Sequence, residues 1–345
     1  MRQKLGTLQL LAELGTVFKI AAPPKIEAPE ALWLGLSPKE GQLRQGPLTI
    51  ASLGADPPDR STHFHLTPMS FADGVATEIT FEISAEDQRL IFEQAKRLNT
   101  PKLTIVEGTD REHGLVWESL GDMGTRRPEE VNGKPVSENL PEGDGDILLR
   151  RFIDDSVNLL SELPLNEQRL DEGLPQINLL WPWGQGVRQP VPNLALKRGE
   201  RADVFSASLR LAGLTRLAGY KHGDRVAFGK GINTRLEELA GNLLKCNLSI
   251  TVIEAPTKLK ELDKPEELNW FADQIDTKLL KPLFENALVS PTEITFLVPA
   301  DEMGIGLRYQ TGNQNTNSIP FDERALDEKS LQTLDLNVAV QQGLL

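Results

Sequence analysis

Cysteine is nearly absent from this 345-residue chain, which holds only Cys246. A single thiol excludes a disulfide framework and a cysteine-based zinc site. Because Cys246 precedes an apolar run that predicts a buried strand, we interpret it as a core thiol rather than a nucleophile. No stretch of about 20 apolar residues predicts a membrane span. The leucines of residues 5–14 are interrupted by Gln9 and Glu13, which favours an amphipathic helix over a signal peptide, and we expect a cytoplasmic protein.

Positive charge is also in deficit, with a formal net charge of -13. An acidic surface repels nucleic-acid phosphates and anionic membranes, so we expect neither as a partner. The remaining composition, with 39% hydrophobic and 25% charged residues, is typical of a globular protein. The length suffices for two domains.

Local patterns in the first half predict an α+β module. We expect a helix at 4–14 ended by Gly15, a strand at 16–22 and a short helix near 27–36. From about 41 to 160 the expected strands are 46–55, 62–71, 76–85, 102–109 and 113–121. Helices are expected at 85–99, with Ser84 or Ala85 as the cap, and at 146–163. Residues 124–147 are polar and rich in Gly and Pro, which predicts a long loop.

From about residue 175, strands and helices alternate. The expected strands are 176–184, 202–208, 225–230, 248–255 and 292–300, and the expected helices are 208–219, 234–246 and 264–287. Such alternation predicts an α/β unit with a mainly parallel sheet flanked by helices.

The segment 164–186 resembles archaeal-type, cofactor-independent phosphoglycerate mutases of the alkaline phosphatase superfamily. The matching positions are Pro164, Asn166, Arg169, Gly173, Pro175, Asn178, Trp183, Gly184 and Gly186. Other segments resemble the family in order along nearly the whole chain. The resemblance implies an alkaline phosphatase-like α/β core at 1–40 and 161–345, interrupted by an inserted α+β domain at 41–160. The family's opening strand has no counterpart, so we expect a gap or an altered edge in the core sheet, covered by another segment or a partner chain.

The resemblance also implies two divalent cations, Mn²⁺ or Mg²⁺ in the family, and a serine that carries the phosphoryl group. The stretch where that serine belongs, 25–35, contains no serine or threonine. Thr257 and Glu261 stand where the family has an aspartate and a histidine, and Glu302 replaces a further histidine after Asp301. No histidine follows His222. We therefore predict no catalytic residue and expect no bound cofactor.

Several residues remain as candidates for binding. His63 and His65 alternate along an expected strand and could bind a cation together, and His63 matches a family arginine that binds an anion. Arg111, His113 and Arg169 are further candidates for a phosphorylated ligand. Glu254, Glu261, Asp301 and Glu302 could hold a single Mg²⁺ or Ca²⁺ as a vestigial metal site. Two of these groups also have a plain structural alternative: surface histidines for His63 and His65, and a solvated acidic cleft for the four acids.

Three functions follow from these observations. The first is a catalytically degenerate, phosphoglycerate mutase-like protein with a binding, scaffolding or regulatory role. The second is an active metal-dependent mutase or related phosphoryl-transfer enzyme, converting 3-phosphoglycerate to 2-phosphoglycerate, with a rearranged site. The third is a non-catalytic subunit of a hetero-oligomer. The expected partners are further protein chains and a small phosphorylated ligand; the sequence does not identify the ligand, the pathway or the oligomeric state.

Overall fold

The structure is a computed structural model that describes residues 6–21, 28–37, 43–81, 83–109, 111–199, 201–253, 264–298, 303–311 and 333–334. The chain divides into two compact units. Unit 1 comprises Met1–Gln42, Pro192–Ser208 and Ala218–Leu345, and unit 2 comprises Leu43–Val191 and Leu209–Leu217. The described part contains no helix long and apolar enough to cross a membrane.

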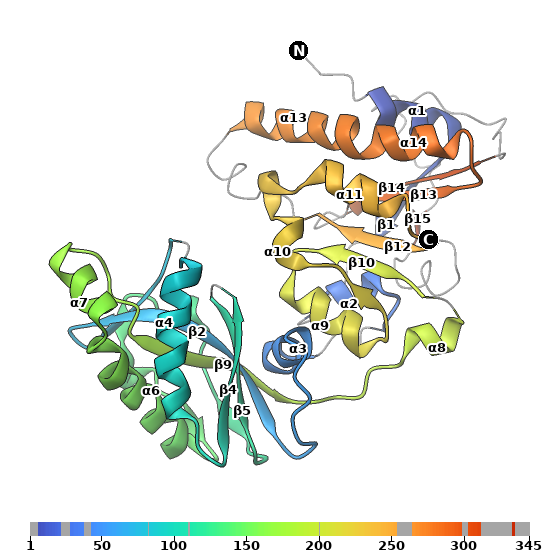
Figure 1. Ribbon diagram of the computed structural model, residues 1–345. Helices are drawn as coiled ribbons and strands as arrows, with labels where there is room; N and C mark the ends of the chain where they lie inside the picture. Colours follow the sequence, from blue (N-terminus) through green and yellow to red (C-terminus); the bar gives the residue numbers. More distant parts are fainter. Residues whose placement is uncertain are drawn as a thin grey trace. The chain divides into compact units, whose positions relative to one another are not determined.

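Unit 2 is built on an antiparallel sheet of order β4-β5-β2-β3-β7, with β9 paired to the other edge of β2 (Figure 1). The long strand β2 turns into β3 through Asp73 and Gly74, both with positive φ, as a two-residue hairpin requires. Two short strands, β6 and β8, pair separately. The bounds are β2 Thr62–Ala72, β3 Val75–Glu78, β4 Leu103–Thr109, β5 Glu112–Trp117, β6 Met123–Gly124, β7 Lys134–Pro135, β8 Glu142–Gly143 and β9 Leu179–Val187.

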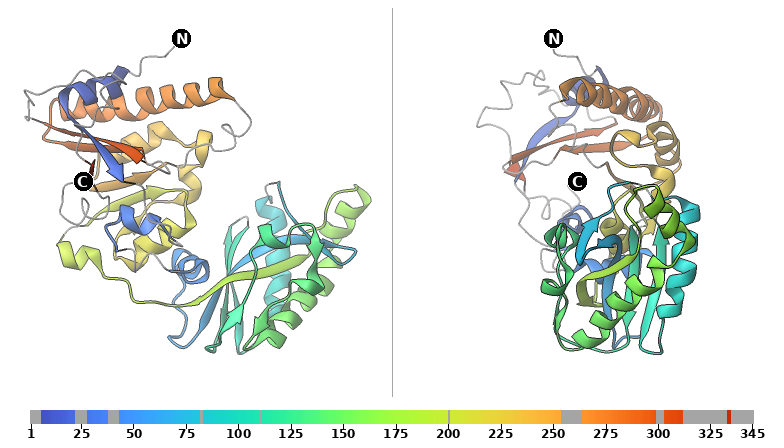
Figure 2. Two further views of the ribbon diagram at one scale, coloured as in Figure 1. Left: turned by 180° about the vertical axis from the view of Figure 1, so that it is seen from behind. Right: turned by 90° about the vertical axis from the view of Figure 1, so that its left-hand side faces the viewer.

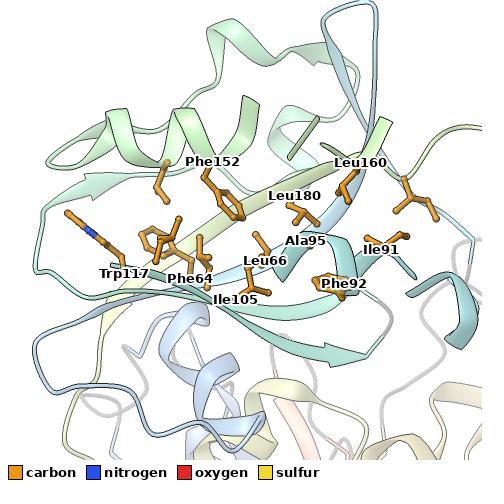
Figure 3. Close-up of a cluster of buried hydrophobic side chains, with 14 of the residues drawn as sticks. Phe64, Leu66, Ile91, Phe92, Ala95, Ile105, Trp117, Phe152, Leu160 and Leu180 are labelled. Carbon is orange, nitrogen blue, oxygen red and sulfur yellow. The ribbon is translucent and has the colours of Figure 1, made fainter. Parts of the chain in front are cut away.

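Helices pack on both faces of this sheet. On one face, α4 (Ala85–Ala95) and α6 (Asp146–Ser161) bury a large apolar cluster, to which Phe64 of β2, Phe92 and Phe152 belong (Figure 3). On the other face, α3 (Gln45–Ser52) packs on β2, β5 and β9 and against α9 (Leu209–Leu217). The smaller elements are α5 Pro128–Val131, α7 Pro164–Asp171 and the 3₁₀ turns η2 Lys96–Leu98 and η3 Val136–Glu138.

The described strands of unit 1 form two sheets. The first, of order β11-β10-β12, is parallel and consists of β10 Asp203–Ser206, β11 Lys221–His222 and β12 Ser249–Val252. The second, of order β13-β14-β1-β15, is antiparallel except for the parallel pair β1/β15, and consists of β1 Thr16–Ala21, β13 Glu293–Val298, β14 Met303–Gln310 and β15 Thr333–Leu334. A parallel sheet with helices around it fits the α/β class, but parallel pairing does not dominate the described strands.

The helices of unit 1 include one long interrupted helix (Figure 2). It runs as α13 (Pro265–Gln274), a π-helical turn η5 (Ile275–Leu280) and α14 (Lys281–Ala287). The others are α1 Gly6–Leu14, α2 Glu30–Trp33, α8 Leu194–Arg198, α10 Arg225–Phe228, η4 Gly231–Asn233 and α11 Leu236–Leu243.

Several sequence predictions of single elements are confirmed. Helix α1 ends at Gly15, whose amide donates to the Leu11 carbonyl at 2.8 Å. Ser84 caps α4 by accepting a hydrogen bond from the Asp87 amide at 3.0 Å. Strands β4 and β5 form the expected antiparallel pair.

Four expectations about single elements were wrong. Residues 46–55 were expected as a strand but form helix α3, and 225–230 contain helix α10 instead of a strand. Residues 46–51 of α3 are buried all round, so no helical period is visible in the sequence. The strand expected at 76–85 stops at Glu78. The loop expected at 124–147 contains short elements anchored by the buried Val131 and Val136.

Strand β9 also has a different setting from the expected one. The sequence grouped it with the parallel strands that follow, whereas it pairs antiparallel with β2 from Thr62 to Met69. A fully apolar run is typical of any strand buried on both faces, so its composition does not reveal its neighbour.

Candidate functional site

The two histidines of β2 lie under helix α3. Residues 63 and 65 point to the face opposite Phe64, whose side chain belongs to the large apolar cluster. The neighbouring strand agrees, because Gly114, which pairs with His65, would place a Cβ 2.4 Å from Ile50 of α3. The sequence prediction that these histidines share a face is confirmed, although the pairing of β2 with β9 shifts register between them.

His65 is bound by protein oxygens at both ring nitrogens. Its Nδ1 lies 2.8 Å from the Thr49 hydroxyl of α3, and its Nε2 lies 3.2 Å from the Arg111 carbonyl. The ring also lies against Trp183, with centroids 4.9 Å apart. With both nitrogens occupied, the imidazole joins α3, β2 and the β4–β5 turn, and it offers no lone pair to a cation in this arrangement.

His63 has one satisfied and one unsatisfied nitrogen. Its Nε2 lies 2.9 Å from the Ser61 hydroxyl, which itself donates to the Pro58 carbonyl. Its Nδ1 is buried and has no hydrogen-bond partner within the described residues. Burial, followed by the positive charge of Arg188, lowers the pKa of His63 from 6.5 to about 4. The ring is therefore neutral near pH 7 and adds no positive charge to an anion site.

His113 lies on the opposite face of the sheet from His63 and His65. It pairs with Leu66, stacks on Phe92 at 3.7 Å and is fully buried. Its Nδ1 accepts a hydrogen bond from the Gly108 amide at 3.0 Å. The structure therefore does not bring His113 together with the histidines of β2.

Arg111 and Arg169 contact the protein itself. Arg111 donates from Nη1 to the Ile79 carbonyl at 2.9 Å. Arg169 donates from Nε to the Pro175 carbonyl at 2.8 Å, and its guanidinium lies 4.5 Å from the centre of the Phe81 ring. Of the five proposed ligand-binding residues, His65 and Arg111 are in direct contact, and their roles toward a ligand stay predictions.

The asparagines of the 164–186 motif fasten the start of β9 to its surroundings. Asn166 is fully buried, donates from Nδ2 to the carbonyls of Leu160 and Ile177, and accepts from the Ile177 amide. Asn178 bonds both the amide and the carbonyl of Phe71. These residues hold the backbone in place, which gives the motif a structural role.

The glycines of the same motif allow a close approach between β9 and α3. Gly184 has a φ of 65°, and a Cβ there would lie 2.8 Å from the Gln45 Cβ. At Gly186 a Cβ would lie 3.1 Å from the ring of Pro47. Their role is therefore steric.

The four acids proposed as a vestigial metal site cannot be placed. Glu254, Glu261, Asp301 and Glu302 lie outside the described residues, as does Thr257. Among the residues that are described, no group of three or more His, Cys, Asp or Glu side chains could hold a metal ion.

Asp276 has a clear structural contact with the N-terminal helix. It is buried within the π-helical turn and accepts hydrogen bonds from the amides of Thr7 and Leu8 at 3.0 and 2.8 Å. The carboxylate therefore caps the first turn of α1.

The remaining histidine and the cysteine lie in unit 1. Burial is the largest effect that lowers the pKa of His222, and its Nδ1 lies 2.6 Å from the Gly223 carbonyl. Cys246 is half-buried rather than part of the core, and burial followed by the charge of Asp203 raises the pKa of its thiol. A raised pKa disfavours the thiolate, in line with an unreactive cysteine.

Sequence reasoning missed three residues around the histidines of β2. Ser61 lies only two positions before His63, so its proximity in the sequence could have indicated the contact. Thr49 was assigned to a strand, which hid its bond to His65. Arg188 forms an ion pair with Asp56, 132 positions away, at 2.7 Å, and no local pattern reveals that contact.

No protein-family model matches the chain. Its curated relatives are named 2,3-bisphosphoglycerate-independent phosphoglycerate mutases. The protein from Methanothrix thermoacetophila is 28% identical over 189 residues, which are 54% of this chain and 48% of that relative, so this match spans about half of the relative's length. The relatives from Methanosarcina mazei and Methanosarcina barkeri are 22% and 25% identical over 90% and 86% of this chain, and over 83% and 80% of their own lengths.

Solved structures show the same fold. The cofactor-independent phosphoglycerate mutase from Thermoplasma acidophilum superposes with a TM-score of 0.65 at 18% identity, over 98% of this chain and 90% of that one. A protein from Pyrococcus horikoshii gives a TM-score of 0.74 at 16% identity, over 98% and 88% of the two chains. Taken with the sequence relatives, these matches identify the chain as a homologue of the 2,3-bisphosphoglycerate-independent phosphoglycerate mutases.

Proposed function

We propose that this chain is a phosphoglycerate mutase-like protein that has lost phosphoryl-transfer chemistry and acts by binding, as a scaffold or a regulator. The observation that carries the proposal is the distribution of imidazoles. All four histidines lie at or before position 222, whereas the family places later ligands beyond it. The stretch 25–35, where the nucleophile belongs, has no hydroxyl side chain.

The histidines that are present do not fit the two-cation site that the family implies. His65 has a protein oxygen at each nitrogen, and His113 is stacked on Phe92 and accepts an amide. His63 has only a buried nitrogen to offer. Zinc, manganese and magnesium sites need donors that converge on one open position, and these side chains do not converge. No step of a reaction is therefore assigned to a bound metal.

The same proposal includes an alkaline phosphatase-like arrangement of the core. The core would comprise 1–40 and 161–345, with the inserted domain at 41–160. A cytoplasmic location, an oligomer with the same or another chain, and a small phosphorylated ligand are further parts of the proposal, as is a single Mg²⁺ or Ca²⁺ at Glu254, Glu261, Asp301 and Glu302.

The test is an activity assay on the purified full chain. With 3-phosphoglycerate and added Mn²⁺ or Mg²⁺, we expect no formation of 2-phosphoglycerate above the rate without protein. The Methanosarcina mazei relative, prepared and assayed in parallel, serves as the positive control. Turnover that disappears on chelation would contradict the proposal and support the second function, an active mutase with a rearranged site.

Ligand binding is measured separately by calorimetry with 3-phosphoglycerate. Binding without turnover supports a retained phospho-ligand site, and the double variant Arg111→Ala, His63→Gln tests whether the inserted domain provides it. If 3-phosphoglycerate is neither bound nor converted, the result supports a scaffolding function without a phospho-ligand site. A subunit of a hetero-oligomer would instead gain activity when mixed with a complete homologue, and co-purification identifies such a partner.

A further inference from the structure

Asn132 and Gly133 form the only Asn-Gly pair in the sequence. They connect α5 (Pro128–Val131) to β7 (Lys134–Pro135), and Asn132 is exposed. Glycine leaves the preceding side chain open to attack by the backbone, because it has no Cβ to obstruct the approach. We propose that Asn132 is a site of spontaneous deamidation whose reaction is held back by the folded corner of β3, α5 and β7.

The reaction requires water but no oxidant or enzyme. The backbone nitrogen of Gly133 gives up its proton to a base and bonds to Cγ of Asn132. The bond from Cγ to the side-chain nitrogen breaks, and ammonia leaves with a proton, which closes a five-membered succinimide ring. Water then adds to one of the two ring carbonyl carbons and opens the ring, giving either aspartate or isoaspartate.

Both reacting groups are tied to β3 in the folded protein. The Gly133 amide, which supplies the attacking nitrogen, donates to the Ala76 carbonyl at 2.8 Å. The side-chain oxygen of Asn132 accepts from the Glu78 amide at 2.9 Å. The attack therefore requires that at least the first of these hydrogen bonds be broken, which exposes the amide to base.

The backbone of Asn132 is also turned away from the reactive geometry. Its φ and ψ angles are -56° and 122°. Because the peptide unit is planar and rigid, the Gly133 nitrogen can reach Cγ of Asn132 only if the backbone rotates about ψ, together with a matching side-chain rotation about χ1. That rotation would displace the corner, which is anchored by Val131, fully buried against Met69, Ala76 and Ile153.

The product would weaken the corner that protected it. Glu78 and Glu129 already lie close to this turn, and their mutual repulsion adds to burial in raising the pKa of Glu78. A new carboxylate at position 132 adds a third negative charge there. Isoaspartate would in addition lengthen the backbone by one carbon and shift the Gly133 amide from Ala76. The fraction of molecules deamidated at Asn132 would thus increase with the frequency at which the corner of β3, α5 and β7 opens.

The experiment compares deamidation of the folded full chain with that of the same chain in urea, at one mildly alkaline pH, by mass-spectrometric peptide mapping. We expect the folded chain to react at least about tenfold more slowly. Val131→Ala, which removes the buried anchor, should speed the reaction in the folded chain, whereas Val187→Ala, an exposed valine of the same sheet, should not.

Equal rates in the folded and unfolded chains would overturn the proposal. Circular dichroism shows whether Val131→Ala remains folded. If it does not, hydrogen exchange of the Gly133 amide in the unmodified protein decides, since the proposal requires this amide to be protected, and exchange as fast as in a peptide contradicts it.

Discussion

At the scale of single residues, three histidines on neighbouring strands have three different environments. His65 is bonded at both nitrogens, His113 is stacked in the core on the other face, and His63 keeps a buried nitrogen without a partner within the described residues. Spacing along β2 correctly placed the first pair on one face. The partners that decide what each ring can do come from α3, α4 and the β4–β5 turn, and they depend on the assembled sheet.

The depressed pKa of His63 predicts a loss of stability in mild acid. The unfolded chain binds a proton near pH 6.5, whereas the folded chain does so only near pH 4. The contribution of the neutral ring is therefore complete above about pH 6.5 and is lost as the pH falls toward 4, by about 3 kcal/mol. Urea unfolding at several pH values should show this slope.

His63→Gln is the variant that isolates the effect, because glutamine does not titrate and can still bond Ser61. Its unfolding free energy should vary less between pH 6.5 and 4 than that of the unmodified chain. The pKa of His222 is also lowered, so His222→Asn serves as the control and should keep the part of the slope due to His63. Parallel curves for His63→Gln and the unmodified protein would refute the assignment.

At the scale of elements, the junction between β9 and α3 depends on backbone proximity. Gly184 and Gly173 both have positive φ, 65° and 70°, but their surroundings differ. A Cβ at Gly184 would meet Gln45, whereas a Cβ at Gly173, just after α7, would meet nothing within 4 Å. The two glycines therefore separate the cost of backbone conformation from the cost of a steric clash.

Replacing each glycine by alanine should give unequal losses. For Gly173→Ala we expect a loss of about 1 kcal/mol in the free energy of unfolding, from the backbone conformation alone. For Gly184→Ala we expect about 3 kcal/mol, because the clash with α3 adds to the same conformational cost. Urea unfolding of the two variants measures both losses of free energy. Equal losses would show that α3 can move to accommodate a side chain at position 184 at no cost.

At the scale of the whole molecule, unit 1 is held together by contacts between its N-terminal segment and segments near the C-terminal end of the sequence. Asp276 accepts from Thr7 and Leu8 across 269 and 268 positions, and β1 pairs with β14. The π-helical turn that carries Asp276 has a wider backbone than an α-helix, a feature that is often found where a side chain has a special role. Here that role is to accept hydrogen bonds from the amides of the first turn of α1.

Asp276→Asn should loosen the N-terminal helix. Asparagine keeps one acceptor oxygen but turns a donor toward the second amide and removes the negative charge that favours a helix start. We expect a loss of about 1–2 kcal/mol in unfolding free energy and faster hydrogen exchange at Thr7 and Leu8. Asp273→Asn, one turn earlier in the same helix, is the control and should change neither.

The sequence by itself determined the locally encoded features and the relationship to the family. The cap at Ser84, the helices α4 and α6 and the hairpin β4–β5 follow from periodicity and capping over a few neighbouring residues. The motif around Asn166 indicated the resemblance because a buried, fully bonded asparagine tolerates few replacements.

Only the tertiary structure decided the state of α3, the partner of β9 and the roles of the histidines. Helix α3 is buried on every side, so its sequence shows no alternation of apolar and polar residues at the helical period. Strand β9 pairs with β2, which lies more than 100 positions earlier in the chain. Hydrogen bonds such as Thr49–His65 and Asp276–Thr7 form only after these elements have assembled. Long-range pairing is set by the packing of complete faces, which a local pattern does not encode.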